Sequence, residues 1–352
     1  MTVDIYRKLA QHLDDLPGGF PATESGVELR ILQRLFTPEE AELALHLTPV
    51  PEKCEVIASR AGIAPEEAAQ RLNKMAKKGL IYNIEGDGRP TKYRASQYMV
   101  GIWEFHVKDL DVGLIQDTNE YFPTLFDEAW KVPQLRTIPV GRSLTPQHEV
   151  LPYEQAEELV RAQDRIAVAP CICRREHTLV EKGCHRPQET CLVFGSGADY
   201  YVRNGLGRSI DLDETLEILD LAEKAGLVLQ PSNAKKAAFI CLCCGCCCQV
   251  LKNLKRHPKP ASLVSSPFVA TVNLDTCEGC GDCVERCQME ALELGDKTVA
   301  LDMDRCIGCG LCITACPTDS LAMVRKPDSE QPEIPENMIE AYRNLAKARG
   351  KI

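Results

Sequence analysis

Residues 277–287 read CEGCGDCVERC, and residues 306–316 read CIGCGLCITAC. Both stretches have the spacing C-x2-C-x2-C-x3-C, and every cysteine of the second copy lies 29 positions after its counterpart in the first. An internal repeat that keeps eight thiols in register indicates a duplicated ligand set, because chance rarely preserves so many positions. In each copy three closely spaced thiolates can wrap three corners of an iron–sulfur cubane, while the fourth, one helical turn further on, is directed at the other cubane.

The repeat resembles the bacterial-type ferredoxin domain that binds two [4Fe-4S] clusters, and the resemblance covers residues 268–326. It implies one cluster on Cys277, Cys280, Cys283 and Cys316. It implies a second cluster on Cys306, Cys309, Cys312 and Cys287. A pair of zinc knuckles is the alternative, but such sites favour CxxC pairs separated by longer loops and often contain histidine. One departure from the family pattern is that Cys316 precedes Pro317 whereas Cys287 precedes Gln288.

Short β-type runs inside the repeat predict its architecture. Leu292–Leu294 and Val299–Leu301 flank a Gly295-Asp296 turn, a pattern typical of a hairpin. Together with the short helical turns between cysteines, this predicts an α+β fold for the segment. We expect the whole chain to be a multidomain α+β protein.

The number of cysteines and their positions bear on the cellular compartment. The chain has 19 cysteines, and 18 of them lie between Cys171 and Cys316. The charged N-terminus, MTVDIYRKLAQHLDD, lacks the apolar core of a signal peptide, so we expect a cytoplasmic protein. Because the cytosol keeps thiols reduced, metal ligation by soft thiolates is favoured over structural disulfides.

Charge and hydropathy limit the classes of partner. No run reaches the roughly 18 apolar residues that a membrane span needs, so no membrane insertion is expected. A net charge of -10 argues against non-specific attraction to nucleic acid or anionic lipid as the main purpose.

Residues 151–260 carry ten further cysteines and are expected to form a cysteine-rich metal-binding domain. The ten are Cys171, Cys173, Cys184, Cys191, Cys241, Cys243, Cys244, Cys246, Cys247 and Cys248. A helix that begins after Asp211 and ends at Gly226 separates the first four from the last six, so both groups can return to one site. If the stretch CLCCGCCC were helical, its spacing would place Cys244 with Cys248 and Cys243 with Cys247.

The cysteine count leaves several ligand sets open in this middle domain. Ten thiols allow two further cubanes with two thiols to spare. They equally allow a single cluster, whose ligands would be Cys171, Cys173, Cys184 and Cys191. We expect one or two iron–sulfur clusters in addition to the ferredoxin pair, and zinc is the alternative. Arg174 and Arg175 could steady an anionic cluster through charge and hydrogen bonds.

The arrangement as a whole resembles a family of anaerobe-type 4Fe-4S proteins. In that family an APCxCR segment, a later CCGCCC segment and a C-terminal dicluster ferredoxin share one chain; here they begin at Ala169, Cys243 and Cys277. The CCG element is also similar to the cysteine-rich domains of heterodisulfide-reductase-like proteins, although only one copy is present.

The N-terminal third, residues 1–100, contains no metal pattern. Residues 55–81 predict a helix, a turn at Gly62 and a second helix, and residues 81–95 predict two strands around a Gly86-Asp87-Gly88 turn. This order resembles a winged-helix domain of the MarR/ArsR kind.

Between residues 27 and 95, eleven Lys or Arg stand against ten Asp or Glu, and the would-be recognition helix opens with Glu66 and Glu67. Such charges favour a protein-interaction or vestigial winged helix, with DNA binding as the minority alternative. Residues 101–150 then connect to the cysteine-rich domain, and residues 327–352 form a linker and a C-terminal helix.

These patterns lead to a primary functional hypothesis and two rivals. We expect an iron–sulfur electron-transfer protein, or the relay subunit of an anaerobic oxidoreductase, rather than an independent catalyst, because no G-x-G-x-x-G fingerprint or Walker motif occurs. Its partner would be a redox protein: a ferredoxin, a flavoprotein or a larger oxidoreductase complex. One rival is an iron–sulfur redox-sensing DNA-binding regulator, and the other is an oxidoreductase with catalysis at a middle-domain cluster.

Overall fold

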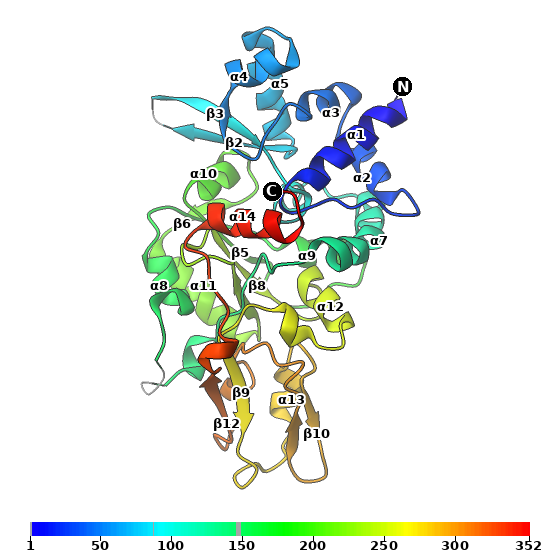
Figure 1. Ribbon diagram of the computed structural model, residues 1–352. Coiled ribbons are helices and arrows are strands. Elements are labelled where there is room, and N and C mark those ends of the chain that lie inside the picture. Colours follow the sequence, from blue (N-terminus) through cyan, green and yellow to red (C-terminus); the bar gives the residue numbers. More distant parts are fainter. Residues whose placement is uncertain (1, 87, 146–148) are drawn as a thin grey trace. The chain divides into compact units, whose positions relative to one another are not determined.

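The computed structural model (Figure 1) describes the whole chain except residues 1, 87 and 146–148. It combines helices with antiparallel sheets, so the predicted α+β class is confirmed. The described residues pack as two compact units. One comprises residues 1–131, 199–207 and 342–352, which we call the N-terminal unit, and the other comprises residues 132–198 and 208–341, which we call the cysteine unit.

The N-terminal unit is mainly helical. Its elements are α1 (Thr2–Asp15), α2 (Val27–Leu35), α3 (Pro38–Ala44), β1 (Glu52–Lys53), α4 (Cys54–Ala61), α5 (Pro65–Lys77), β2 (Ile81–Gly86), β3 (Arg89–Ala95), η1 (Tyr98–Ile102), α6 (Trp103–Phe105) and α7 (Val112–Ala129), with the end of α10 (Ser196–Arg203) and most of α14 (Met338–Ala348). Helix α3 begins with a capping box, in which Thr37 Oγ1 accepts from Glu40 N and Glu40 Oε2 accepts from Thr37 N.

Helices α4 and α5 and the β2–β3 hairpin lie where the sequence predicts a helix pair and two strands. The sheet has the order β1-β3-β2, and Asp87 of the predicted turn lies outside the described residues. The buried stripe of α5 consists of Ala68, Leu72, Met75 and Ala76, as expected from the helical period. Glu66 and Glu67 are exposed at the start of this helix.

Ion pairs join the last residues of the chain to helix α1. Arg349 Nη2 lies 2.6 Å from Asp14 Oδ1, and Lys351 Nζ lies 2.9 Å from Asp14 Oδ2. Burial alone would raise the pKa of Asp14, but the hydrogen bonds from Lys351 and Phe20 and the charge of Arg349 lower it. The predicted C-terminal helix is therefore present and anchored.

The cysteine unit contains a five-stranded antiparallel sheet in the order β6-β4-β5-β8-β7. Its elements are η2 (Gly141–Ser143), η3 (Pro152–Glu154), α8 (Ala156–Arg161), β4 (Ile166–Pro170), α9 (Ile172–Leu179), β5 (Glu189–Phe194), the start of α10, β6 (Arg208–Ile210), α11 (Leu212–Lys224), β7 (Val228–Pro231), β8 (Phe239–Cys243), α12 (Gln249–Arg256) and η4 (Pro260–Leu263). The predicted helix after Asp211 is α11, and Asp211 Oδ1 caps it by accepting from Glu214 N at 2.9 Å.

The same unit includes the ferredoxin-like segment, built from two small antiparallel pairs. Its elements are β9 (Phe268–Val272), α13 (Asp282–Arg286), β10 (Leu292–Leu294), β11 (Val299–Leu301), η5 (Ile313–Ala315) and β12 (Leu321–Arg325), followed by η6 (Asp328–Glu330). Strand β12 pairs with β9, which brings the two ends of the repeat together (Figure 1). Strands β10 and β11 pair as the predicted hairpin.

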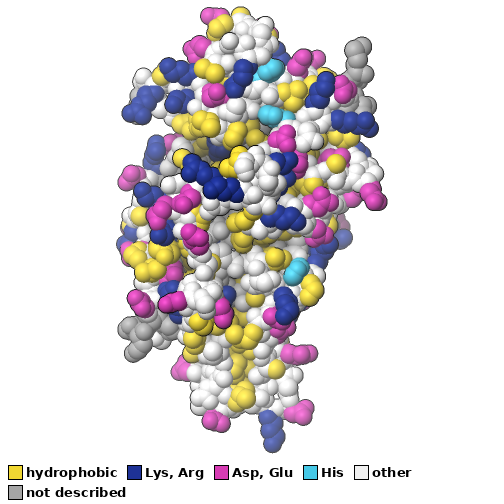
Figure 2. All heavy atoms as spheres, in the orientation of Figure 1, with side chains coloured by type: hydrophobic (Ala, Val, Ile, Leu, Met, Phe, Trp, Pro, Cys, Tyr) yellow, Lys and Arg dark blue, Asp and Glu magenta, His cyan; other side chains and the backbone are white. Residues whose placement is uncertain are grey.

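The surface shows no single dominating charge on the face drawn in Figure 2, where Lys and Arg side chains are interspersed with Asp and Glu side chains. Among the described residues, no helix has the length and apolar character needed to cross a bilayer.

Candidate metal centres

The first ferredoxin-like set consists of Cys277, Cys280, Cys283 and Cys316, which the structure brings to one small cavity. Strand β12 follows Cys316 and pairs with β9, and this pairing returns the fourth cysteine to the first copy of the repeat. The Cys280 side chain is exposed, whereas Cys283 is buried. One corner of this set therefore reaches the surface of the protein.

The second ferredoxin-like set consists of Cys306, Cys309, Cys312 and Cys287, and it is more deeply buried. Burial, followed by the charges of the Cys287 and Cys306 thiolates, raises the pKa of Cys309 to about 12. Burial, followed by the charges of the Cys309 and Cys306 thiolates, also raises the pKa of Cys312. Four mutually repelling thiolates in such a site require cations, and soft thiolates select iron or zinc.

The backbone around both sets fits iron–sulfur clusters. Gly279 and Gly308 have positive φ, and a Cβ atom on Gly308 would lie 2.1 Å from the carbonyl oxygen of Phe268. Amide groups four residues after the last cysteine of each copy donate to sulfur: Ala291 N to Cys287 Sγ and Ser320 N to Cys316 Sγ, both at 3.3 Å. Such N–H···S bonds tune iron–sulfur centres, so the residues present fit the clusters that the repeat implies.

The ten middle-domain cysteines gather at one edge of the five-stranded sheet. Strands β4 and β8 both run antiparallel to β5, which lies between them, so they run in the same direction and end at the same edge. The chain carries cysteines directly after β4, around the start of β5 and at the end of β8. The prediction that both cysteine groups return to one region is therefore confirmed by the strand pairing.

Six of these thiols form a continuous string, which we call the six-thiol group. Each member is in side-chain contact with the next, in the order Cys171, Cys173, Cys248, Cys243, Cys241 and Cys191. The contact at one end of the string follows from register, because Cys191 of β5 is paired directly with Cys241 of β8.

Two helix N-termini point at the six-thiol group. Cys171 is the N-cap of α9, and Cys248 is the N-cap of α12. The side-chain hydrogen bonds from Cys173 and Cys243, and then the backbone N–H groups of α12, lower the pKa of Cys248. The free amides and the dipole of a helix start stabilise thiolates, as they do at reactive cysteines.

The other four thiols form a compact cluster, which we call the four-thiol group: Cys184, Cys244, Cys246 and Cys247. Their sulfur atoms all lie within 4.8 Å of one another, with 4.0 Å between Cys184 and Cys244 and 3.8 Å between Cys246 and Cys247. Burial alone would raise the pKa of Cys184, but the backbone N–H of Arg186 and the neighbouring thiols lower it to about 7. This group is a candidate metal site separate from the ferredoxin-like sets.

Arg174 lies between the two middle-domain groups and is completely buried. Its Nη1 atom lies 3.6 Å from Cys244 Sγ and 3.2 Å from the carbonyl oxygen of Leu242, and its Nη2 atom donates to Thr190. Burial alone would lower the pKa of Arg174, but the charges of the Cys171 and Cys244 thiolates outweigh burial and raise this pKa above its usual value. Arg174 thus contacts a ligand group as the sequence predicts.

Two sequence-based interpretations of the middle domain are wrong in their geometry. The stretch CLCCGCCC is not helical: β8 ends at Cys243, a turn follows, and α12 begins only at Gln249. Cys244 therefore joins Cys247 rather than Cys248, and Cys243 contacts Cys248. In addition, Cys184 lies in the four-thiol group and not with the other three thiols of the single-cluster alternative.

A junction inside the cysteine unit was not foreseen from the sequence. Gln288, which stands where the family pattern has proline, is buried and accepts a hydrogen bond from Gly245 N through Oε1 at 2.8 Å. Gly245 belongs to the turn that carries the four-thiol group, so this turn docks directly beside Cys287 of the second ferredoxin-like set. The sequence shows that Gln288 departs from the family pattern. It does not show that Gly245, 43 positions away, is the hydrogen-bond partner of Gln288.

Two further contacts join the ferredoxin-like segment to the rest of the cysteine unit. Val140 N donates to the carbonyl oxygen of Cys309 at 3.0 Å. Arg286 of α13 donates to the carbonyl oxygens of Lys224 and Glu223 at the end of α11, where a cation also suits the helix dipole. The contacts of Gln288 and Arg286, on either side of Cys287, therefore place the second ferredoxin-like set next to the middle domain.

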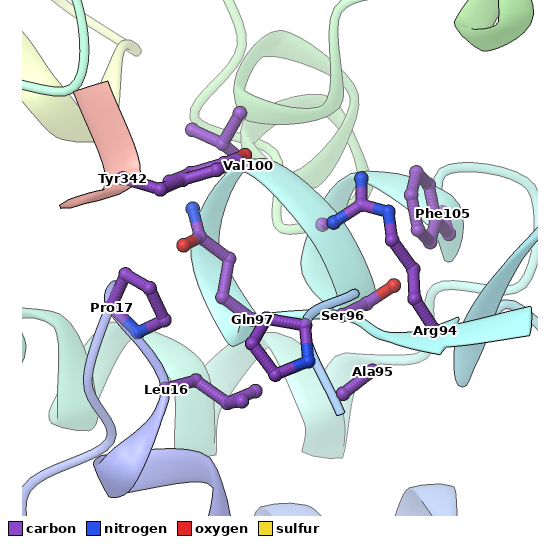
Figure 3. A pocket seen from close by; sticks show the side chains of 11 residues that line it. Leu16, Pro17, Arg94, Ala95, Ser96, Gln97, Val100, Phe105 and Tyr342 are labelled. Carbon is purple, nitrogen blue, oxygen red and sulfur yellow. The ribbon is translucent and has the colours of Figure 1, made fainter. Parts of the chain in front are cut away.

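The N-terminal unit contains a pocket with no comparable chemistry. Leu16, Gln97, Val100 and Tyr342 contribute to its lining (Figure 3), and Arg94 is the one charged side chain among its lining residues. No thiol, imidazole or carboxylate group lines it, so it is no candidate metal centre.

Comparison with known proteins supports the assignment of the C-terminal segment. Residues 276–320 match the model of a 4Fe-4S dicluster domain, and residues 299–348 match that of a 4Fe-4S single cluster domain. No curated protein and no solved structure matches the chain. The C-terminal segment is thus a [4Fe-4S] dicluster domain, consistent with electron transfer.

Proposed function

We propose that this protein is an electron-transfer iron–sulfur protein that relays single electrons within a larger anaerobic oxidoreductase. One observation carries the proposal: the dicluster domain has one ligand set at the surface, through Cys280, and the other against a middle domain with ten more thiols. Clusters of this type supply one-electron transfer over a wide range of potentials. With four thiolates each, they leave no open coordination position for a substrate.

The residues of the chain are arranged for such a relay. The exposed edge at Cys280 allows close approach of a redox partner such as a ferredoxin or a flavoprotein. At the second set, the carbonyl oxygen of the half-buried Cys309 accepts a hydrogen bond from Val140 N. The hydrogen bond between Gly245 N and Gln288 joins the turn of the middle domain to the residue after Cys287 of the same set.

The six-thiol group supports a further iron–sulfur cluster in the middle domain. Among the described residues, no three of its sulfur atoms lie within the mutual 4.8 Å found in the four-thiol group, so the string does not form a single-ion pocket. Its six buried or half-buried thiols, two helix N-termini and Arg174 fit a larger, anionic, multi-iron centre.

For the N-terminal unit we propose a winged-helix module that contacts protein rather than DNA. The exposed Glu66 and Glu67 at the start of α5 support this choice, because base contacts come from the first residues of a recognition helix.

The experiment compares the full-length protein with its Cys309→Ser variant, and both are purified without oxygen. The unaltered protein should contain at least eight irons. In Cys309→Ser, the electron paramagnetic resonance signal of one ferredoxin cluster should change, and electron transfer from a low-potential reductant to a protein acceptor should slow. Cys54→Ser is the matched control, because Cys54 lies in α4 outside every ligand group.

Two results would contradict the relay. Four irons in total would remove the two-cluster basis of the proposal. Turnover of a small substrate by the isolated protein, at a rate that Cys309→Ser leaves unchanged, would place the active site in the middle domain instead.

A further inference from the structure

We propose that the four-thiol group binds one tetrahedral metal ion, Zn²⁺, and is therefore a different kind of site from the iron–sulfur clusters. Its ligands would be Cys184, Cys244, Cys246 and Cys247. The inference does not depend on the relay function, because it concerns only how many metal ions these four sulfur atoms can enclose.

The separation of the sulfur atoms carries the inference. Zinc–sulfur bonds of about 2.3 Å in a tetrahedron place the sulfurs about 3.8 Å apart. The separations here are 4.0 Å for Cys184 and Cys244 and 3.8 Å for Cys246 and Cys247, and all pairs lie within 4.8 Å. The space between four such sulfurs holds one ion.

The dicluster domain supplies an internal comparison. In a cubane each thiolate binds a different iron atom, so the four sulfurs stand further apart than around one ion. Within the described residues, neither ferredoxin-like set brings even three of its sulfurs within 4.8 Å of one another, whereas the four-thiol group brings all four. The sulfur atoms of the four-thiol group are therefore closer together than those of the two ferredoxin-like sets in the same chain.

The charges around the group suit a divalent ion. Four thiolates and Zn²⁺ carry a net charge of about −2. Two arginines donate to the sulfurs: Arg174 Nη1 lies 3.6 Å from Cys244 Sγ, and Arg186 Nη1 lies 3.4 Å from Cys246 Sγ. These cations balance the complex and orient its ligands through N–H···S bonds.

The position of the group in the fold indicates a structural role. Cys184 comes from the loop between α9 and β5, and the other three ligands come from the turn between β8 and α12. A site with four protein ligands has no open position for catalysis, and it cross-links the segments that supply them. Here the ion would hold the turn whose Gly245 docks on Gln288 beside the second ferredoxin-like set.

The test measures metals in full-length protein purified without oxygen. We expect about one zinc per chain in addition to iron, and zinc-edge X-ray absorption of the unaltered protein should show four sulfur neighbours at about 2.3 Å. Cys246→Ser, which changes an exposed side chain, should lose the zinc and keep the iron content. Cys191→Ser, a member of the six-thiol group, should keep the zinc.

The outcomes separate clearly. Loss of about four irons from Cys246→Ser, with no zinc in the unaltered protein, would overturn the single-ion site. Loss of one iron in place of zinc would overturn the identity of the ion. The absorption measurement needs no variant, so a Cys246→Ser protein that fails to fold leaves the proposal testable: zinc with oxygen or nitrogen neighbours, or no zinc, would refute it.

Discussion

Replacement of Gly245 by alanine tests the junction between the four-thiol turn and the dicluster domain. An ideal Cβ atom on residue 245 would lie 2.2 Å from the carbonyl oxygen of Gln288, and ordinary contacts begin at 3.4 Å, so the two segments must separate by at least 1.2 Å. Gly245 does not have a positive φ, so its backbone conformation suits alanine. The substitution therefore changes the junction and little else.

The expected cost follows from the contacts that are lost. Overpacking costs about 1–3 kcal/mol, and the hydrogen bond from Gly245 N to Gln288 is worth about 1 kcal/mol. Alanine restricts the unfolded chain more than glycine does, and this effect stabilises the folded protein by about 0.4–1 kcal/mol. The net destabilisation is about 2 kcal/mol, which corresponds to a fall of roughly 4–8 °C in the unfolding temperature of a unit of about 200 residues.

The assay is thermal unfolding of the anaerobic holoprotein, followed by circular dichroism in the near-ultraviolet and visible ranges at one fixed heating rate. Gly141→Ala is the matched control, because its Cβ atom would meet nothing within 4 Å and Gly141 also lacks a positive φ. Gly141→Ala should unfold at the temperature of the unaltered protein or slightly above it. If Gly245→Ala unfolds at the same temperature as Gly141→Ala, the junction does not hold the two parts together and the reasoning is refuted.

Three further predictions rest on other contacts. Gln288→Pro restores the proline of the family pattern but leaves the buried N–H of Gly245 without its acceptor, so it should destabilise the protein by about 1–3 kcal/mol in the same assay; an unchanged unfolding temperature would contradict this. Asp14→Asn should increase hydrogen exchange at the end of α14. Burial raises the pKa of Asp14, but Lys351, Phe20 and Arg349 together lower it, so the same loosening in the unaltered protein should appear only as the pH falls below about 4 and the carboxylate takes up a proton. Selection from genomic DNA with oxidised and reduced holoprotein should recover no reproducible sequence at physiological salt, since the start of α5 is acidic at Glu66; a palindrome bound with redox-dependent affinity would favour the regulator.

Elements whose signals lie close together in the sequence could be predicted. Each half of the dicluster repeat spans eleven residues, and within so short a stretch the spacing alone brings thiols together. The same holds for helix α11 after Asp211 and for the hairpin Leu292–Leu294 with Val299–Leu301. In each case the deciding contacts are three or four residues apart or lie across a single turn.

The division of the ten middle-domain cysteines was decided only by the tertiary structure. Sequence spacing assumed one conformation for residues 241–248, but the segment is a strand, a turn and a helix start in succession, and this change sends neighbouring thiols to different groups. Cys184 meets Cys244 across 60 positions, and Gly245 meets Gln288 across 43. Contacts over such distances depend on the order and register of β4, β5 and β8, because strand pairing and not local spacing determines which side chains face one another.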